Sequence, residues 1–113
     1  MANQGAVDHL ISAEVAGTAV AMSNVPTYID TIELMNTTAA VAYLQVFWVA
    51  SGSVTPGTTV PDVVIGLPAS GGAVLHFEGE GWKTRGTAWS AIATTTRTGS
   101  TGAAVSVTVW KKR

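Results

Sequence analysis

The chain contains no cysteine among its 113 residues, which excludes disulfides, thiolate metal sites and cysteine nucleophiles. Charge is also scarce, since Asp, Glu, Lys and Arg make up 12% of the sequence, about half the usual share. The formal net charge is −1, so the basic patch that nucleic-acid binding proteins normally carry is missing. We therefore expect no nucleic-acid partner, and a surface so poor in charge is typical of a chain that other chains partly cover.

Long apolar runs are missing as well. No stretch approaches the ~20 apolar residues that a membrane-spanning helix needs, and residues 1–5 lack the basic start and apolar run of a signal peptide. We therefore expect no membrane association and synthesis in a cytoplasm. The glycosylation sequon Asn36-Thr37-Thr38 is discounted for the same reason.

What the sequence does contain is a series of strand patterns. Residues 28–36 alternate with a period of two, and residues 104–110 do so strictly, with a row of valines on one face and Trp110 on the other. Residues 41–50 are apolar on both faces, and Tyr43 and Phe47 share one of them. Such a strand is either central in its sheet or turned toward a partner.

Turn signals rich in glycine and proline separate these strands from shorter ones. The shorter strands are predicted at residues 14–22, 63–67, 73–77, 82–85 and 87–95. Residues 63–67 and 73–77 are expected to form a hairpin. The total of seven or eight antiparallel strands predicts an all-β, jelly-roll-like β-sandwich in a single domain, with a closed barrel as the alternative. Residues 1–12 are interpreted as an N-terminal arm or lead-in strand, and residues 13–113 as the sandwich domain.

Catalytic chemistry is hard to find in this sequence. The sequence has two histidines, His9 and His76, but no Gly-x-Ser-x-Gly motif, so it shows no nucleophilic serine for which a histidine could act as the base of a hydrolase triad. Glu78 and Glu80 lie in a glycine-rich turn, which suits neither a buried glycosidase acid nor a calcium loop. We predict no catalytic residue, no cofactor site and no metal site, and hence a protein that is not an enzyme.

The tryptophans are the most informative residues, because four of the eight aromatic residues are Trp. Trp48 and Trp89 are predicted to be core or half-buried. Trp110 is predicted to point away from the core, and Trp82 lies beside a polar turn that carries a lysine and an arginine. The predicted interface residues are Tyr43, Phe47, Trp82, Arg85 and Trp110.

The middle of the chain resembles small structural proteins of tailed bacteriophages. The resemblance rests on Tyr43–Phe47, on the loop Val54–Pro61, on Ile65–Ala69 with the following Gly-Gly turn, and more loosely on Thr84–Ile92. It covers roughly residues 43–95, and its motifs are turn-and-strand patterns rather than catalytic signatures. The sequence departs from the pattern at two tryptophans, positions 48 and 82.

The resemblance implies a jelly-roll virion protein, most specifically a capsid decoration (cement) protein. Such a protein forms a homotrimer on the outside of the head and stabilises the shell by binding the major capsid protein. Its place would be the virion, after synthesis in the host bacterial cytoplasm. A tail or baseplate component shares every sequence feature, and a carbohydrate-binding β-sandwich module with exposed tryptophan is the alternative from another class of protein.

Overall fold

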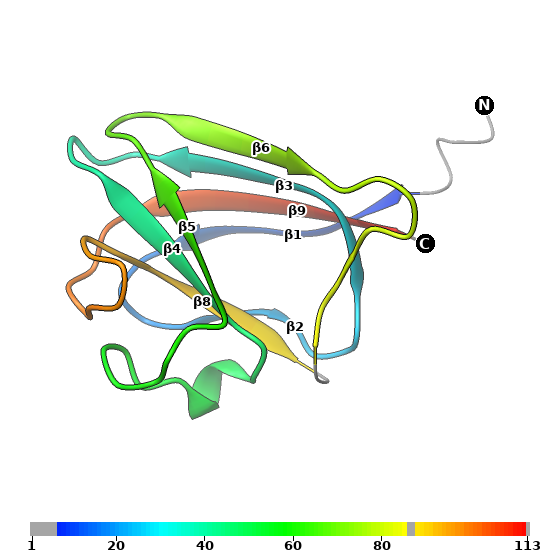
Figure 1. Ribbon diagram of the computed structural model, residues 1–113, viewed down its shortest axis with the longest axis horizontal. Helices are drawn as coiled ribbons and strands as arrows, with labels where there is room; N and C mark the ends of the chain where they lie inside the picture. The colour runs from blue at the N-terminus through cyan, green and yellow to red at the C-terminus, as the bar shows by residue number, and fades with distance from the viewer. Residues whose placement is uncertain (1–6, 86–87, 113) are drawn as a thin grey trace.

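The computed structural model describes residues 7–85 and 88–112, which form two antiparallel sheets packed face to face (Figure 1). The part of the predicted N-terminal arm that covers residues 1–6 lies outside the described residues, and residues 7–12 belong to the first strand. The strands are β1 (Val7–Val15), β2 (Val20–Ser23), β3 (Tyr28–Asn36), β4 (Ala42–Phe47), β5 (Val63–Leu67), β6 (Gly72–His76), β7 (Trp82–Lys83), β8 (Trp89–Thr94) and β9 (Val105–Lys112).

The strands pair in a nested order. One sheet runs β1-β9-β3-β6, with the two-residue β7 also paired to β3, and the other runs β2-β8-β4-β5. The first long strand thus pairs with the last, the second with the next to last, and so on inward to β4 and β5. This winding is that of a jelly roll. The predicted fold class is confirmed, and the barrel alternative is wrong because the strands form two separate sheets.

The described chain has nine strands, more than the seven or eight predicted. The segment 14–22, expected as one strand, is divided between the end of β1 and the start of β2, which lie in different sheets. Gly17 lies at this crossing. A Cβ there would come within 3.1 Å of the Gly102 Cα, so the small residue lets two loops approach closely.

The core fills the space between the two sheets. The inward face of β9 contributes Val105, Val107 and Val109, each at most 1% exposed, and β3 contributes Ile32 and Leu34. These are the apolar positions of the alternating patterns in the sequence. Each strand therefore buries one face because its side chains alternate across the sheet.

The chain's own loops cover the outer face of the four-stranded sheet. Every residue of β8 is buried, so both faces of this strand are covered. The residues of β4 are also buried, except for the half-buried Tyr43. The loop after β4 carries a short 3-10 helix, η2 (Ser51–Ser53), that contacts β8 (Figure 1). The loop after β8 accepts a hydrogen bond from the buried Gln45 at the Gly99 carbonyl. The two-sided apolar strand is therefore central and internally covered.

The predicted hairpin between residues 63–67 and 73–77 is wrong. β5 pairs with β4 in one sheet, and β6 pairs with β3 in the other. The turn between them crosses from sheet to sheet because it is hydrogen-bonded to the β3–β4 connection. Asn36 N donates to Gly71 O, and Ser70 N donates to Thr38 O, at 2.8 and 2.9 Å. The turn residues were recognisable in the sequence, whereas these partners 32 to 35 residues away were not.

Candidate interaction surfaces

The five predicted interface residues do not form one surface. Trp82 and Arg85 line the same depression at one end of the sandwich. Trp110 lies half-buried on the outer face of the five-stranded sheet, pointing away from the valines of β9 as predicted. Tyr43 is half-buried on β4, whereas Phe47 is 0% exposed. A side chain with no exposed surface has nothing to offer a partner, so Phe47 is a core residue rather than an interface anchor.

Four aromatic side chains form a row of ring contacts at the end of the sandwich where β4 ends and β8 begins. The ring centroids lie 6.0 Å apart for Trp89 and Trp48, 5.2 Å for Trp48 and Trp82, and 5.1 Å for Trp82 and Phe77. Trp89 is fully buried and the other three are half-buried, so the row runs from the core to the surface. The predicted burial of Trp48 and Trp89 is confirmed. We term this region, defined by these four residues, the tryptophan end.

Exposed apolar side chains gather around the tryptophan end. They are Val25, Tyr28 and Val49, and Val25 precedes Pro26, which lines the depression together with Trp82. Val49 directly follows Trp48 in the chain. Tyr28 is the first residue of β3, and the ammonium nitrogen of Lys83 lies 5.7 Å from the centroid of its ring. Apolar side chains with nearby cations at a strand end suit contact with another protein better than contact with solvent.

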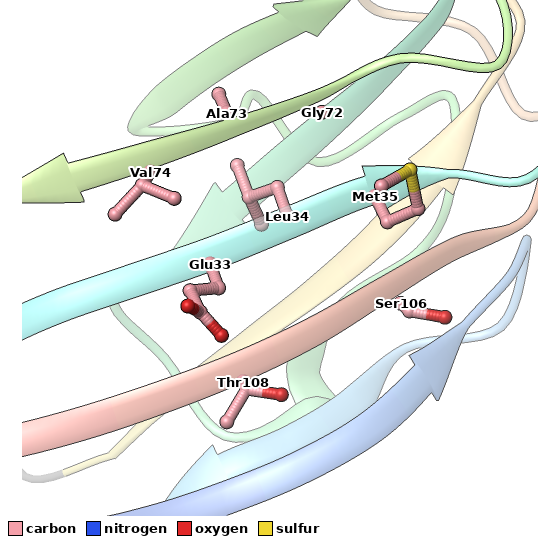
Figure 2. Close-up of a pocket in the computed structure, with 8 residues that line it drawn as sticks. All are labelled: Glu33, Leu34, Met35, Gly72, Ala73, Val74, Ser106 and Thr108. Atoms are coloured by element: carbon pink, nitrogen blue, oxygen red, sulfur yellow. The ribbon is translucent and has the colours of Figure 1, made fainter.

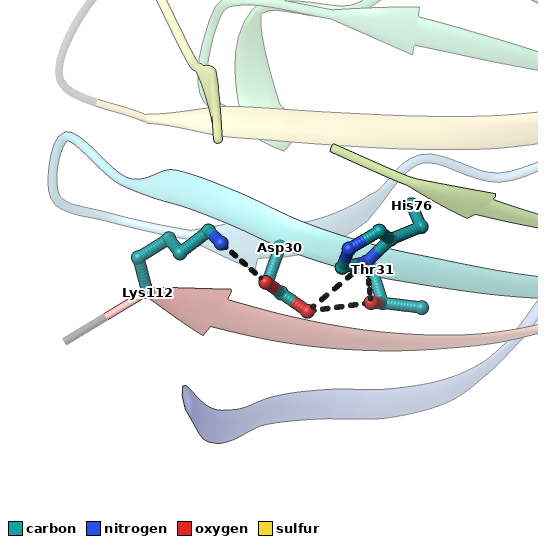
Figure 3. A network of polar contacts seen from close by, with 4 residues as sticks. All are labelled: Asp30, Thr31, His76 and Lys112. Atoms are coloured by element: carbon teal, nitrogen blue, oxygen red, sulfur yellow. Dashed lines mark hydrogen bonds and ion pairs between the residues drawn. The ribbon is translucent and has the colours of Figure 1, made fainter. Parts of the chain in front are cut away.

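A polar network lies on the outer face of the five-stranded sheet, and Asp30 is its centre (Figure 3). Its carboxylate accepts a charge-assisted hydrogen bond from Lys112 Nζ at 2.6 Å and one from Thr31 Oγ1 at 2.6 Å. His76 Nδ1 lies 3.2 Å from Thr31 Oγ1 and 3.6 Å from Asp30 Oδ2. The Asp30 side chain is only 9% exposed, so these partners replace most of its water.

The network is built to hold a charge rather than to activate a nucleophile. The hydrogen bond from Lys112, followed by that from Thr31, holds the pKa of the Asp30 carboxyl below its usual value, and burial opposes them only in part. The Thr31 hydroxyl donates its proton to Asp30, whose charge is already neutralised by Lys112. A catalytic hydroxyl would instead donate to a base that is free to take its proton.

The lowered pKa of Asp30 predicts a loss of stability in acid. A carboxyl whose pKa is lower in the folded state stabilises the fold above its unfolded value of 3.8, and this contribution disappears as the pH falls through the folded pKa. Urea unfolding of the wild type and of Asp30→Asn should therefore differ most near neutral pH. The difference should shrink steadily below about pH 4. A difference that stays constant with pH would contradict an ionised Asp30 in the fold.

An open hollow of about 560 Å³ lies on the same outer face, between β9, β3 and β6 (Figure 2). It is present because Gly72 has no side chain and Ser106 a short one, while Glu33, Met35 and Val74 stand around it. Met35 and Val74 are 49% and 64% exposed. The sequence analysis missed this hollow, because its lining comes from three strands that are distant in the chain.

Within residues 7–85 and 88–112, no three His, Asp or Glu residues converge on a point that could hold a metal ion. No helix in these ranges is long and apolar enough to cross a bilayer.

The fold and these surfaces define a jelly-roll β-sandwich with two open regions, the tryptophan end and one sheet face. No family model, curated protein or solved structure matches the chain.

Proposed function

We propose that this protein is a structural protein of a bacteriophage particle, most specifically a capsid decoration protein that binds the outside of the head and stabilises it. The observation that carries the proposal is the tryptophan end. It gathers half-buried aromatic rings, exposed valines and the cations Lys83 and Arg85 at one end of a rigid sandwich. The phage-like loop of residues 54–61 follows β4 at the same end.

The mechanism is adhesive. Burial of exposed apolar side chains against the shell is worth roughly 25 cal/mol per Å², and association costs offset part of this gain. Many weak contacts on a closed shell then add up through multivalency. The jelly-roll fold supplies rigidity. Viral proteins and lectins use the same fold, which supports the proposal by analogy of fold alone.

The alternatives are separated by copy number and by surface chemistry. A tail or baseplate component would use the same end but would be present in few copies. Carbohydrate binding is favoured by one observation, the half-exposed Trp110 on an open sheet face, but a sugar platform needs free hydrogen-bonding groups beside the ring. On this face Ser12 and Thr31 are bonded to neighbouring side chains, so we place this function second.

The matched pair Val49→Asp and Val41→Asp tests the proposal. Both valines flank β4, at 41% and 49% exposure, but Val49 lies at the tryptophan end and Val41 at the opposite end of the strand. We expect Val49→Asp to bind undecorated capsids at least about tenfold more weakly, because a charge would be buried in the contact, and Val41→Asp to bind like the wild type. The measurement is co-sedimentation with capsids, alongside quantitative mass spectrometry of purified particles.

Four outcomes would count against the proposal. No binding of the wild type to capsids under any condition would reject a decoration role. A handful of copies per particle, instead of a simple ratio to the major capsid protein, would assign the protein to the tail. Wild-type binding by Val49→Asp would place the contact elsewhere on the molecule, and equal losses in the two variants would show that the loss is not specific to the tryptophan end.

A further inference from the structure

The outer face of the five-stranded sheet is an ordered grid of side chains. The strand registers align three rows across β1, β9, β3 and β6. The rows are His9-Trp110-Thr31-His76, Ser12-Thr108-Glu33-Val74 and Glu14-Ser106-Met35-Gly72. Unlike the outer face of the other sheet, this grid is not covered by any loop of the described residues, as the exposure of Met35 and Val74 shows.

The two central strands of this face are complementary in size. Along β9 the outward residues are large, small and small: Trp110, Thr108 and Ser106. Along β3 they are small, large and large: Thr31, Glu33 and Met35. A two-fold axis parallel to the strands and between β9 and β3 would lay β9 of one molecule over β3 of another. Every large central side chain would then face a small one.

The edges and ends of the face agree with this arrangement. The same axis lays β1 over β6, which brings Glu14 over Gly72 and Ser12 over Val74, while His9 meets His76. The end of β9 that carries Lys112 lies over the β3 bulge that carries Asp30. Lys112 and Asp30 form an ion pair within each chain. In the dimer, Lys112 of one copy would also lie over Asp30 of the other, and no acidic residue would lie directly over another acidic residue.

Most polar groups of this face already have partners, which lowers the cost of desolvating it. The exception is the exposed Glu33 carboxylate, which has no partner among the described residues and would lie over the Thr108 hydroxyl of the second copy. Ser12 Oγ donates to Thr108 Oγ1 at 3.3 Å, and Ser106 Oγ donates to Glu14. Thr31 and Lys112 both donate to Asp30. Polar groups that are bonded within one molecule can be buried in an interface without being left unsatisfied, while Met35 and Val74 supply apolar area.

We propose that this face binds a second copy of the same chain, in a face-to-face dimer related by the two-fold axis described above. Met35 of the second copy enters the hollow beside Ser106. Four strands at about 4.8 Å spacing and six residues at about 3.3 Å rise give a contact of roughly 400 Å² per molecule in plan. Over both molecules this is about 800 Å², below the ~1,000 Å² of a stable specific interface, so the dimer is weak and reversible and its population rises with protein concentration. This inference does not depend on the proposed function, because the tryptophan end shares no residue with the face.

An exchange of large and small residues between two chains tests this geometry. Ser106→Trp fills the hollow, so two such chains would set Trp against Met35 twice, and we expect the dimer dissociation constant to rise at least about tenfold. Met35→Ala makes space at the facing position. An equimolar mixture of the two variants should therefore recover the dimer. In the mixed dimer one contact sets the new tryptophan against the new alanine, and the other sets Met35 against Ser106 as in the wild type. Ser53→Trp, on the exposed η2, is the control for an added surface tryptophan.

Sedimentation velocity over a range of concentrations gives the readout, with circular dichroism to show that each variant is folded. A wild-type dimer, a weakened Ser106→Trp dimer and a recovered mixture would support the proposal. A wild type that stays monomeric up to its solubility limit would overturn it. So would a dimer or trimer that Ser106→Trp leaves intact, or a mixture of folded variants that fails to recover.

Discussion

Replacing Phe47 by alanine is expected to lower the free energy of unfolding by about 3–5 kcal/mol, the usual cost of truncating a buried aromatic side chain. The Phe47 side chain is 0% exposed. It shares with Gln45 the face of β4 that points away from the main core, and the loops of the same chain cover that face. The cavity left by alanine would be enclosed by structure that cannot fully collapse into it.

The control is Phe47→Leu, which keeps most of the volume and should cost less than about 2 kcal/mol. Urea denaturation of both variants measures the difference. If Phe47→Ala were as stable as the wild type but bound partners poorly, the side chain would be an interface residue after all, as the sequence suggested.

Replacing Asn36 by alanine is expected to cost about 2–4 kcal/mol, although the side chain is small and polar. Asn36 is 0% exposed, and its amide makes four hydrogen bonds. Nδ2 donates to Ala40 O and Pro68 O at 2.8 and 2.9 Å, and Oδ1 accepts from Thr38 N and Oγ1 at 2.9 and 2.6 Å. These bonds hold together two of the connections by which the chain crosses between the sheets, the one from β3 to β4 and the one from β5 to β6.

Thr38→Val is the matched control, because it removes only the hydroxyl and should cost about 1 kcal/mol. Urea midpoints of the two variants give the comparison. Equal losses in both would mean that the bonds from Asn36 to the two carbonyls contribute nothing. Asn36 is also the asparagine of the sequon, and its Nδ2 donates to two backbone carbonyls in the folded protein.

Strands with one apolar face were predictable from the sequence. The predicted bounds 28–36 and 63–67 agree with β3 and β5, because alternation along a single strand is a local property of the pleated backbone. The same reasoning placed Trp110 on the outside, opposite Val105, Val107 and Val109. Pairing was less predictable, and the expected hairpin of β5 with β6 failed because side chains of the β3–β4 connection direct that turn to the other sheet.

The candidate surfaces were only partly predictable. Trp82 and Arg85 were selected together and lie together, since they are close in the chain. The Trp82 ring nevertheless packs against the rings of Trp48 and Phe77, which the sequence could not place beside it. Alternation groups Tyr43 with Phe47, but it does not show that Phe47 is fully buried within the chain.

The sequence by itself determined that this protein is all-β and without cysteine chemistry, and it located most of its strands and its outward tryptophan. Those features depend on composition and on a period of two between near neighbours. Only the tertiary structure decided which strands share a sheet, which side of β4 is covered, and that Trp110 and Thr31 stand side by side on an open face. These features depend on contacts between residues up to 105 positions apart, as between Val7 and Lys112. Contacts at such separations produce no periodic pattern in the sequence.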